Sequence, residues 1–193
     1  MSEESSRRSR RAFIWGATGV ALLVVGTCFA LSADLLTGAV EATRYSARFS
    51  ALVMAAAIVA RAPRPLTWAM RRTELTLAFV AAHGVHYATV VLRALVEPGN
   101  KLRGFTIDAV VVVLLGLGLL AVVAGTARAT SLAGRRTHAV AFYVAWTALT
   151  LASTVRARVS VVSAVVLAVL GAAMLWRVAS GLTDRRSSPA LRT

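Results

Sequence analysis

The chain has 193 residues, of which 58% are hydrophobic and 16% are charged, and its mean hydropathy is +0.70. Soluble domains contain about a quarter charged residues, so this composition excludes an ordinary soluble globular domain. The formal charge of +14 would favour a nucleic-acid partner in a soluble protein, but here the cations lie almost entirely between apolar runs. They are expected to anchor helix ends in a membrane, and no nucleic-acid partner is expected. The single cysteine, Cys28, excludes a disulfide within the chain and a thiolate metal cluster.

Six uncharged runs follow one another along the chain. They are residues 12–33, 49–60, 75–92, 109–127, 137–155 and 159–176. Most reach the ~17–25 residues that a helix needs to cross a bilayer. The second run is short, and it crosses only if Arg48 extends its charge to the interface and the helix begins near Tyr45. The sequence predicts an all-α polytopic membrane protein with six transmembrane helices in a bundle.

The cations are distributed unequally between the two sides of this predicted bundle. The predicted divisions are a basic tail over residues 1–11, the six-helix domain over 12–179 and a second tail over 180–193. One side then carries Arg7, Arg8, Arg10, Arg11, Arg61, Arg64, Arg71, Arg72, Arg128, Arg135, Arg136, Arg177, Arg185, Arg186 and Arg192, and the other carries Arg44, Arg48, Arg93, Lys101, Arg103, Arg156 and Arg158. By the positive-inside rule we expect a multi-pass protein of the plasma membrane, in contact with lipid, with both termini cytoplasmic.

The ends of the runs carry ordinary helix signals. Thr73 and Glu74 are expected to start the third span, and Pro63 and Pro65 interrupt the chain before it. The opening Ser9 to Ile14, with its arginine pair, could belong to a signal peptide, but an apolar run of ~20 residues is long for one. We therefore expect a retained helix. Seven glycines are expected to allow close helix approach: Gly16, Gly19, Gly26, Gly116, Gly118, Gly125 and Gly171.

Two of the three histidines, His83 and His86, lie well inside a predicted span. Ionisable groups at that depth are costly and usually functional. Phe79, His83, His86 and Val90 share one helix face, because residues three and four apart are surface neighbours. We expect that face to point into the bundle. Imidazoles there could ligate haem, bind another metal, relay protons, or only form hydrogen bonds across helices.

The third histidine, His138, begins the fifth span. It shares a stripe with Phe142 and Trp146, and Tyr143 is close by in the chain. Aromatic residues at helical spacing are more often packing residues than a cofactor pocket. Arg135 and Arg136 could hold haem propionates, although a charged helix start is the more common explanation.

These two stretches resemble a known family. The stretch from Arg71 to Tyr87, RRTELTLAFVAAHGVHY, is similar to the third helix of bacterial ferric-reductase-like transmembrane domain proteins, where an arginine pair precedes a phenylalanine and then two histidines separated by two residues. His138, with a Tyr five residues later and a Trp eight later, resembles that family's fifth helix. The resemblance implies a six-helix b-type haem domain, with His83, His86 and His138 at the positions of candidate haem ligands.

The chain departs from the two-haem members of that superfamily. Those members carry a second histidine thirteen or fourteen residues after the first, where this chain has Val96 or Glu97 and Leu151 or Ala152. A stacked pair of bis-histidine haems is therefore not expected. His83 also lies about 16 Å along its helix from Arg72, and His138 only about 3 Å from Arg136, so the two are not expected at one depth unless the helices are offset.

The leading hypothesis is an integral membrane electron-transfer protein with one haem b per chain. His83 or His86 would ligate the iron, and His138 would be a second ligand or a group on the propionate side. No dinucleotide-binding or phosphate-loop motif occurs, so electrons would come from quinol or a separate flavoprotein. The alternative is a non-catalytic scaffold or accessory subunit that keeps the fold without haem. A transporter is disfavoured, because no inverted repeat or carboxylate in a span core is evident.

Overall fold

The protein is entirely helical over the residues that the structure describes. The computed structural model describes the backbone of residues 3–60, 72–97, 102–157 and 160–186, and the side chains of 11–60, 72–97, 110–152, 154 and 160–182. It contains six helices: α1 (Glu3–Leu31), α2 (Leu35–Val59), α3 (Arg72–Val96), α4 (Leu102–Thr126), α5 (Leu132–Ala157) and α6 (Val161–Arg186). The predicted all-α class with six helices is confirmed. Pro63 and Pro65 lie outside the described residues, and α3 begins within two residues of the expected start.

The second helix is much longer than its uncharged run. It begins at Leu35, ten residues before Tyr45, and is 25 residues long, so the expected start was wrong. The reason is a cap: Asp34 accepts hydrogen bonds from the backbone N–H and the hydroxyl of Thr37, both at 2.8 Å. These bonds to Thr37 also lower the pKa of Asp34. The helix therefore continues through Arg44 and Arg48, which the charge-free pattern treated as a boundary.

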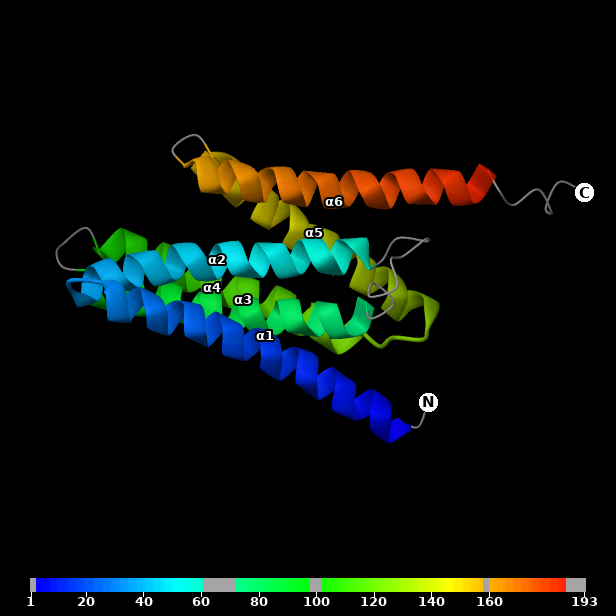
Figure 1. Cartoon of the computed structure of the whole chain (residues 1–193), viewed down its shortest axis with the longest axis horizontal. Coiled ribbons are helices and arrows are strands. Elements are labelled where there is room, and N and C mark those ends of the chain that lie inside the picture. Colours follow the sequence, from blue (N-terminus) through cyan, green and yellow to red (C-terminus); the bar gives the residue numbers. More distant parts are fainter. Residues whose placement is uncertain (1–2, 61–71, 98–101, 158–159, 187–193) are drawn as a thin grey trace, which may run out of the picture.

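The helices run alternately up and down, so that the start of α1 and the end of α6 lie at the same end of the bundle (Figure 1). α2 and α3 form the most extensive helix pair. Around them, α3 packs on α4, α4 on α5, α5 on α6 and α6 on α2, so these five helices close a ring. α1 packs outside the ring against α2 and α3. A ring of this kind has an interior that no single helix pair provides.

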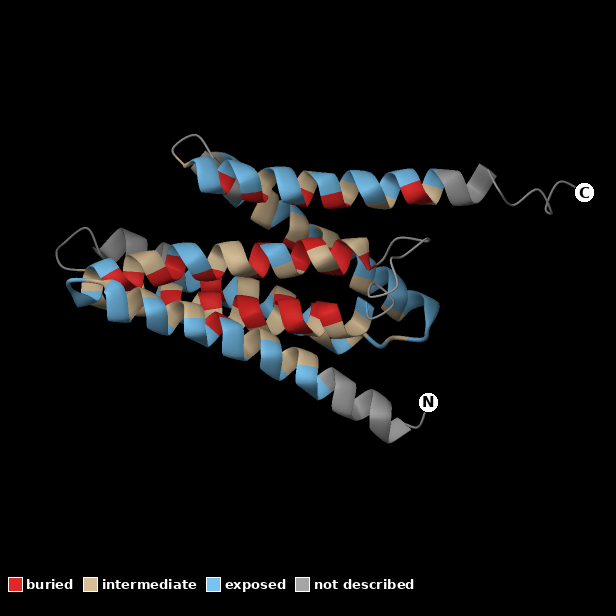
Figure 2. Cartoon of the chain, viewed as in Figure 1, coloured by how far each residue is buried: buried red, intermediate tan, exposed pale blue. Residues whose placement is uncertain are grey.

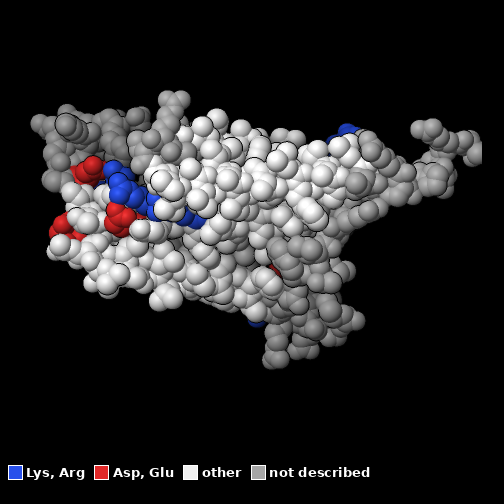
Figure 3. Space-filling view, turned by 45° about the horizontal axis from the view of Figure 1, so that its top comes forward, with Lys and Arg blue, Asp and Glu red and all other residues white. Residues whose placement is uncertain are grey.

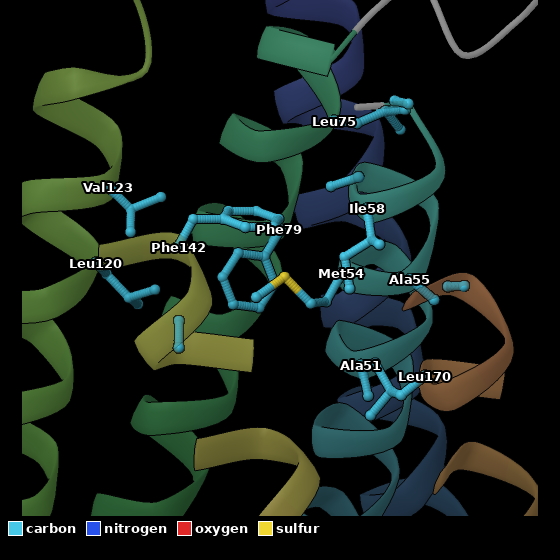
Figure 4. Close-up of a cluster of buried hydrophobic side chains, with 14 of the residues drawn as sticks. Ala51, Met54, Ala55, Ile58, Leu75, Phe79, Leu120, Val123, Phe142 and Leu170 are labelled. Atoms are coloured by element: carbon cyan, nitrogen blue, oxygen red, sulfur yellow. The ribbon is translucent and has the colours of Figure 1, made fainter. Parts of the chain in front are cut away.

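Large apolar side chains fill the middle of the ring. Phe79 of α3, Phe142 of α5 and Met54 of α2 meet there, and Leu120 and Val123 of α4 and Leu170 of α6 close the cluster (Figure 4). Phe79, Met54, Val123 and Leu170 are fully buried. We call this cluster the aromatic core, because its two largest members are Phe79 and Phe142.

The outer surface is apolar along most of its length. Side chains such as Leu23, Leu115, Val140 and Leu175 are exposed, whereas the buried residues lie on the helix faces that look inward (Figure 2). On the face shown in Figure 3 the charged side chains gather mainly towards one end. Among the described residues, three helices are long and apolar enough to cross a bilayer, over Arg11–Leu31, Arg72–Val96 and Val161–Leu182, and Val110–Thr126 is a shorter apolar stretch. These features are typical of a membrane protein.

Only one of the seven glycines singled out by sequence makes the expected close approach. At Gly116 an added Cβ would collide with the phenol of Tyr87. At the other six an added Cβ would meet nothing within 4 Å, because they face outward or into open space rather than a neighbouring helix. A glycine outside that set, Gly38, is packed against the ring of Phe29 and joins α1 to α2. The prediction for the other six was therefore wrong within this chain.

Candidate functional site

The face of α3 that carries His83 and His86 points into the bundle, as predicted. Phe79 is fully buried, and His83 and His86 are only 7% and 8% exposed. The two imidazole rings lie 5.1 Å apart between centroids. Tyr87 packs edge-on against His83 at 4.7 Å. One turn of α3 therefore holds two buried imidazoles and a phenol side by side.

Two serines of α2 hold the two histidines. Ser50 Oγ lies 2.9 Å from Nδ1 of His83, and Ser46 Oγ lies 3.1 Å from Nδ1 of His86. Each pair joins α2 to α3 at one level. The hydroxyl of Ser50 also donates to the carbonyl of Ala47, an arrangement in which its oxygen accepts the Nδ1 proton of His83. That tautomer leaves Nε2 of His83 as an acceptor.

The polar contacts between α2 and α3 continue for one more turn. Ser46 Oγ lies 3.2 Å from Thr89 Oγ1, and Thr43 donates from Oγ1 to the carbonyl of Thr89 at 3.1 Å. Sequence analysis missed these partners on α2, although Thr43, Ser46 and Ser50 recur at a spacing that places them on one helix face. We call these contacts of α2 with His83, His86 and Thr89 the serine–histidine seam.

The two imidazoles line a cavity of about 370 Å³, which we call the histidine cavity. Its remaining walls come mainly from α3, α4 and α5: Phe79, Tyr87, Val90, Arg93, Val112, Gly116, Leu119, Leu120, Ala145, Ala148, Leu149 and Ala152, with Thr43 from α2. α5 lines the cavity with Ala145, Ala148, Leu149 and Ala152, and three of these four side chains are small. Ligand sites are typically such apolar cavities, of about 300–1,000 Å³, with a few polar groups.

Arginines lie beside the histidine cavity at the end of the bundle away from the termini. Arg93 lines both it and a neighbouring cavity of about 590 Å³ that also contains Arg44 and Arg48. Arg93 pairs with Glu97 at 3.5 Å, and Arg44 with Glu41 at 2.6 Å. Arg48 donates to Ser160 Oγ and stacks over Tyr45. Sequence analysis did not single out Arg93, because one cation at a helix end is common.

His138 lies in a different pocket. This second pocket, of about 480 Å³, is lined by Arg72, Thr73, Thr76, Thr126, Ala127, Arg128, Ala129, Thr130, Arg135 and His138, and we call it the arginine pocket. Nδ1 of His138 lies 3.2 Å from Thr126 Oγ1. The aromatic core lies between the two pockets, since Phe79 contacts His83 and Phe142 contacts His138.

The candidate site residues therefore divide into two groups. The structure brings His83 and His86 together but leaves His138 and Arg135 in the arginine pocket, and Arg136 is exposed and does not line it. Phe142 is buried in the aromatic core and Trp146 packs against it, which is the packing role expected for that stripe. Within the described side chains, no group of three or more His, Cys, Asp or Glu residues could hold a metal ion.

Comparison with known proteins identifies no relative of this chain. No protein-family model, curated protein or solved structure matches the chain.

Proposed function

We propose that the protein is a six-span integral membrane b-type cytochrome that binds one haem in the histidine cavity and relays electrons to a partner or acceptor. The observation that carries the proposal is the pair of buried imidazoles, His83 and His86, on the wall of an apolar cavity with Nδ1 of each beside a serine hydroxyl. Histidines that ligate a metal usually donate their other ring N–H to a fixed partner, which sets the tautomer and the ring orientation.

The residues around the cavity fit a haem held from one side. Nε2 of His83 or of His86 would ligate the iron, and the alanine wall of α5 would face the ring. Haem iron in such a site supplies reversible one-electron transfer, with a potential set by the axial ligand and by burial. Arg93, which lines the same cavity, is the cation best placed for a propionate, in place of Arg135 and Arg136.

The same walls argue against two protein ligands on one iron. His83 and His86 extend from one face of one helix, so they do not lie on opposite sides of a ring. The α5 residues that line the cavity are Ala145, Ala148, Leu149 and Ala152, which have no ligating atom. His138 lies beyond the aromatic core. We therefore propose a single histidine ligand, with quinol or a separate flavoprotein as the electron donor.

A reduced-minus-oxidised visible spectrum tests this proposal. The protein would be purified in detergent from haem-sufficient cells, and haem would be quantified as the pyridine haemochrome. We expect about one haem b per chain. One of the two substitutions His83→Ala and His86→Ala should remove it, whereas His138→Ala, the matched control outside the cavity, should retain it.

A second variant covers the case in which a histidine substitution prevents folding. Ala148→Phe would fill the cavity from α5 and leave both histidines in place. It should elute as the wild-type protein does on size exclusion and contain no haem. A wild-type protein that stays colourless after haem supplementation would contradict the proposal.

One observation favours the alternative of a non-catalytic scaffold. Nδ1 of each buried histidine already lies within hydrogen-bond distance of a serine in the seam, so the packing of α2 on α3 needs no cofactor. A scaffold would be colourless and would tolerate His83→Gln or His86→Gln with its partner interactions intact. The haem measurement therefore separates the two functions directly.

A further inference from the structure

The arginine pocket is not used by the proposed haem site, and its composition indicates an anion. It lies where the start of α3, the end of α4 and the start of α5 meet. Arg72, Arg128 and Arg135 line it from three segments of the chain, and all three residues are exposed. None of the described residues that line it is acidic, and Glu74, in the first turn of α3, is not among them.

Polar side chains accompany these charges. Four threonines line the pocket (Thr73, Thr76, Thr126 and Thr130), and so does His138. The hydroxyls of Thr76 and Thr126 donate to the backbone carbonyls of Arg72 and Val122. α3 begins at Arg72, which lines the pocket, so the positive end of the α3 dipole lies beside the pocket. One backbone N–H at the start of α5 already has a partner, because Ser131 Oγ accepts a hydrogen bond from the N–H of Gly134. Three arginine side chains around one polar pocket favour a phosphate group, which accepts charge-assisted and bidentate hydrogen bonds from guanidinium groups.

The surface next to the pocket is apolar. Val122 on α4 and Leu132 and Val140 on α5 are 42%, 58% and 64% exposed, one turn or so from residues that line the pocket. A ligand with a phosphate in the pocket could therefore place hydrocarbon chains along α4 and α5. Basic pockets between membrane helices on the positive side of a membrane protein bind anionic lipid headgroups in this way. A free phosphate would make no contact with this apolar surface.

We propose that the arginine pocket binds the phosphate of an anionic phospholipid from the leaflet on the side of the chain termini. Arg72, Arg128 and Arg135 contact the phosphate, and the exposed apolar flank of α4 and α5 contacts the acyl chains. The proposal rests on the membrane embedding of the helices and not on haem, so a colourless protein leaves it unaffected.

Native mass spectrometry of the full chain in detergent, titrated with phosphatidylglycerol or phosphatidylcholine, tests the proposal. We expect retained phosphatidylglycerol adducts, and roughly tenfold weaker binding in Arg135→Gln, because charge-assisted hydrogen bonds are lost. Arg136→Gln is the matched control, since it removes the same charge one residue away, outside the pocket. Circular dichroism would check that both variants are helical.

The outcomes separate the possible sources of the anion. Phosphatidylglycerol selectivity that depends on Arg135 but not on Arg136 supports the proposal. Equal losses in the two variants would mean general surface charge, and would overturn it. A third outcome is that inorganic phosphate at millimolar concentration displaces the lipid and raises the Tm only when Arg135 is present. That result would assign the pocket to a free phosphate and would overturn the lipid.

Discussion

The histidine cavity and the arginine pocket lie at two levels of the same ring of helices and place the same residue type in opposite surroundings. In the cavity, His83 and His86 are buried, lie within hydrogen-bond distance of serines of the neighbouring helix and have mainly apolar neighbours. In the pocket, His138 is half-buried among arginines and threonines. The aromatic core separates the two. Depth in the bundle, rather than residue type, therefore determines which chemistry each imidazole is suited to.

The separation depends most on the aromatic core, so its removal should have the largest effect. Phe79→Ala should lower the free energy of unfolding by about 3 kcal/mol or more, since it leaves a cavity in a fully buried position. Unfolding would be followed in mixed micelles by titration with sodium dodecyl sulfate. Leu95→Ala, at a 74% exposed position of the same helix, should change stability by less than about 0.5 kcal/mol. Equal effects would show that the two pockets are not divided by a packed core.

Gly116→Ala should affect the histidine cavity alone. The new methyl group would occupy the position of the Tyr87 phenol, which must then move against His83. We expect a loss of about 1–3 kcal/mol, as in other overpacked sites. Gly118→Ala, where an added Cβ meets nothing within 4 Å, is the control on the same helix. If Gly116→Ala also weakened lipid binding at the arginine pocket, the two sites would be coupled.

Double-mutant cycles would compare one histidine hydrogen bond from the histidine cavity with the one in the arginine pocket. We expect a coupling of about 0.6 kcal/mol, and at most about 1.7, between Ser50→Ala and His83→Ala, the range found between membrane helices. The cycle of Thr126→Ala with His138→Ala should give a smaller value, because that pair is accessible to solvent and 3.2 Å apart. A larger coupling energy for Thr126 and His138 than for Ser50 and His83 would contradict the proposed difference between the two sites.

The smallest effect is expected at the cap of α2, which fixes the start of the helix that carries Ser46 and Ser50. Asp34→Ala should lower the Tm slightly and leave the arginine pocket unchanged. The pKa of Asp34 is lowered in the folded state, so its contribution is present above the ordinary carboxyl pKa and is lost as the pH falls through the lowered value. Asp34→Asn should keep the cap but remove this pH dependence. A Tm profile of Asp34→Asn that matches the wild type at all pH values would contradict this role.

The sequence by itself determined the helical class, the six helices and the shared inward face of His83 and His86. Each of these follows from hydropathy and from helical periodicity, which are properties of neighbouring residues in the chain. The start of α2 could also have been found, because Asp34 and Thr37 form a local capping pattern.

Only the tertiary structure decided which helix the histidines face. Ser46 and Ser50 lie 40 and 33 residues before their partners, and nothing in their own helix identifies α3 as the neighbour. The same is true of Gly116, whose close contact depends on Tyr87, and of Arg135, which lies with Arg72 and Arg128 rather than with the buried histidines. Periodicity fixes the direction of a side chain around its own helix, but the packing order of the helices fixes what lies opposite it.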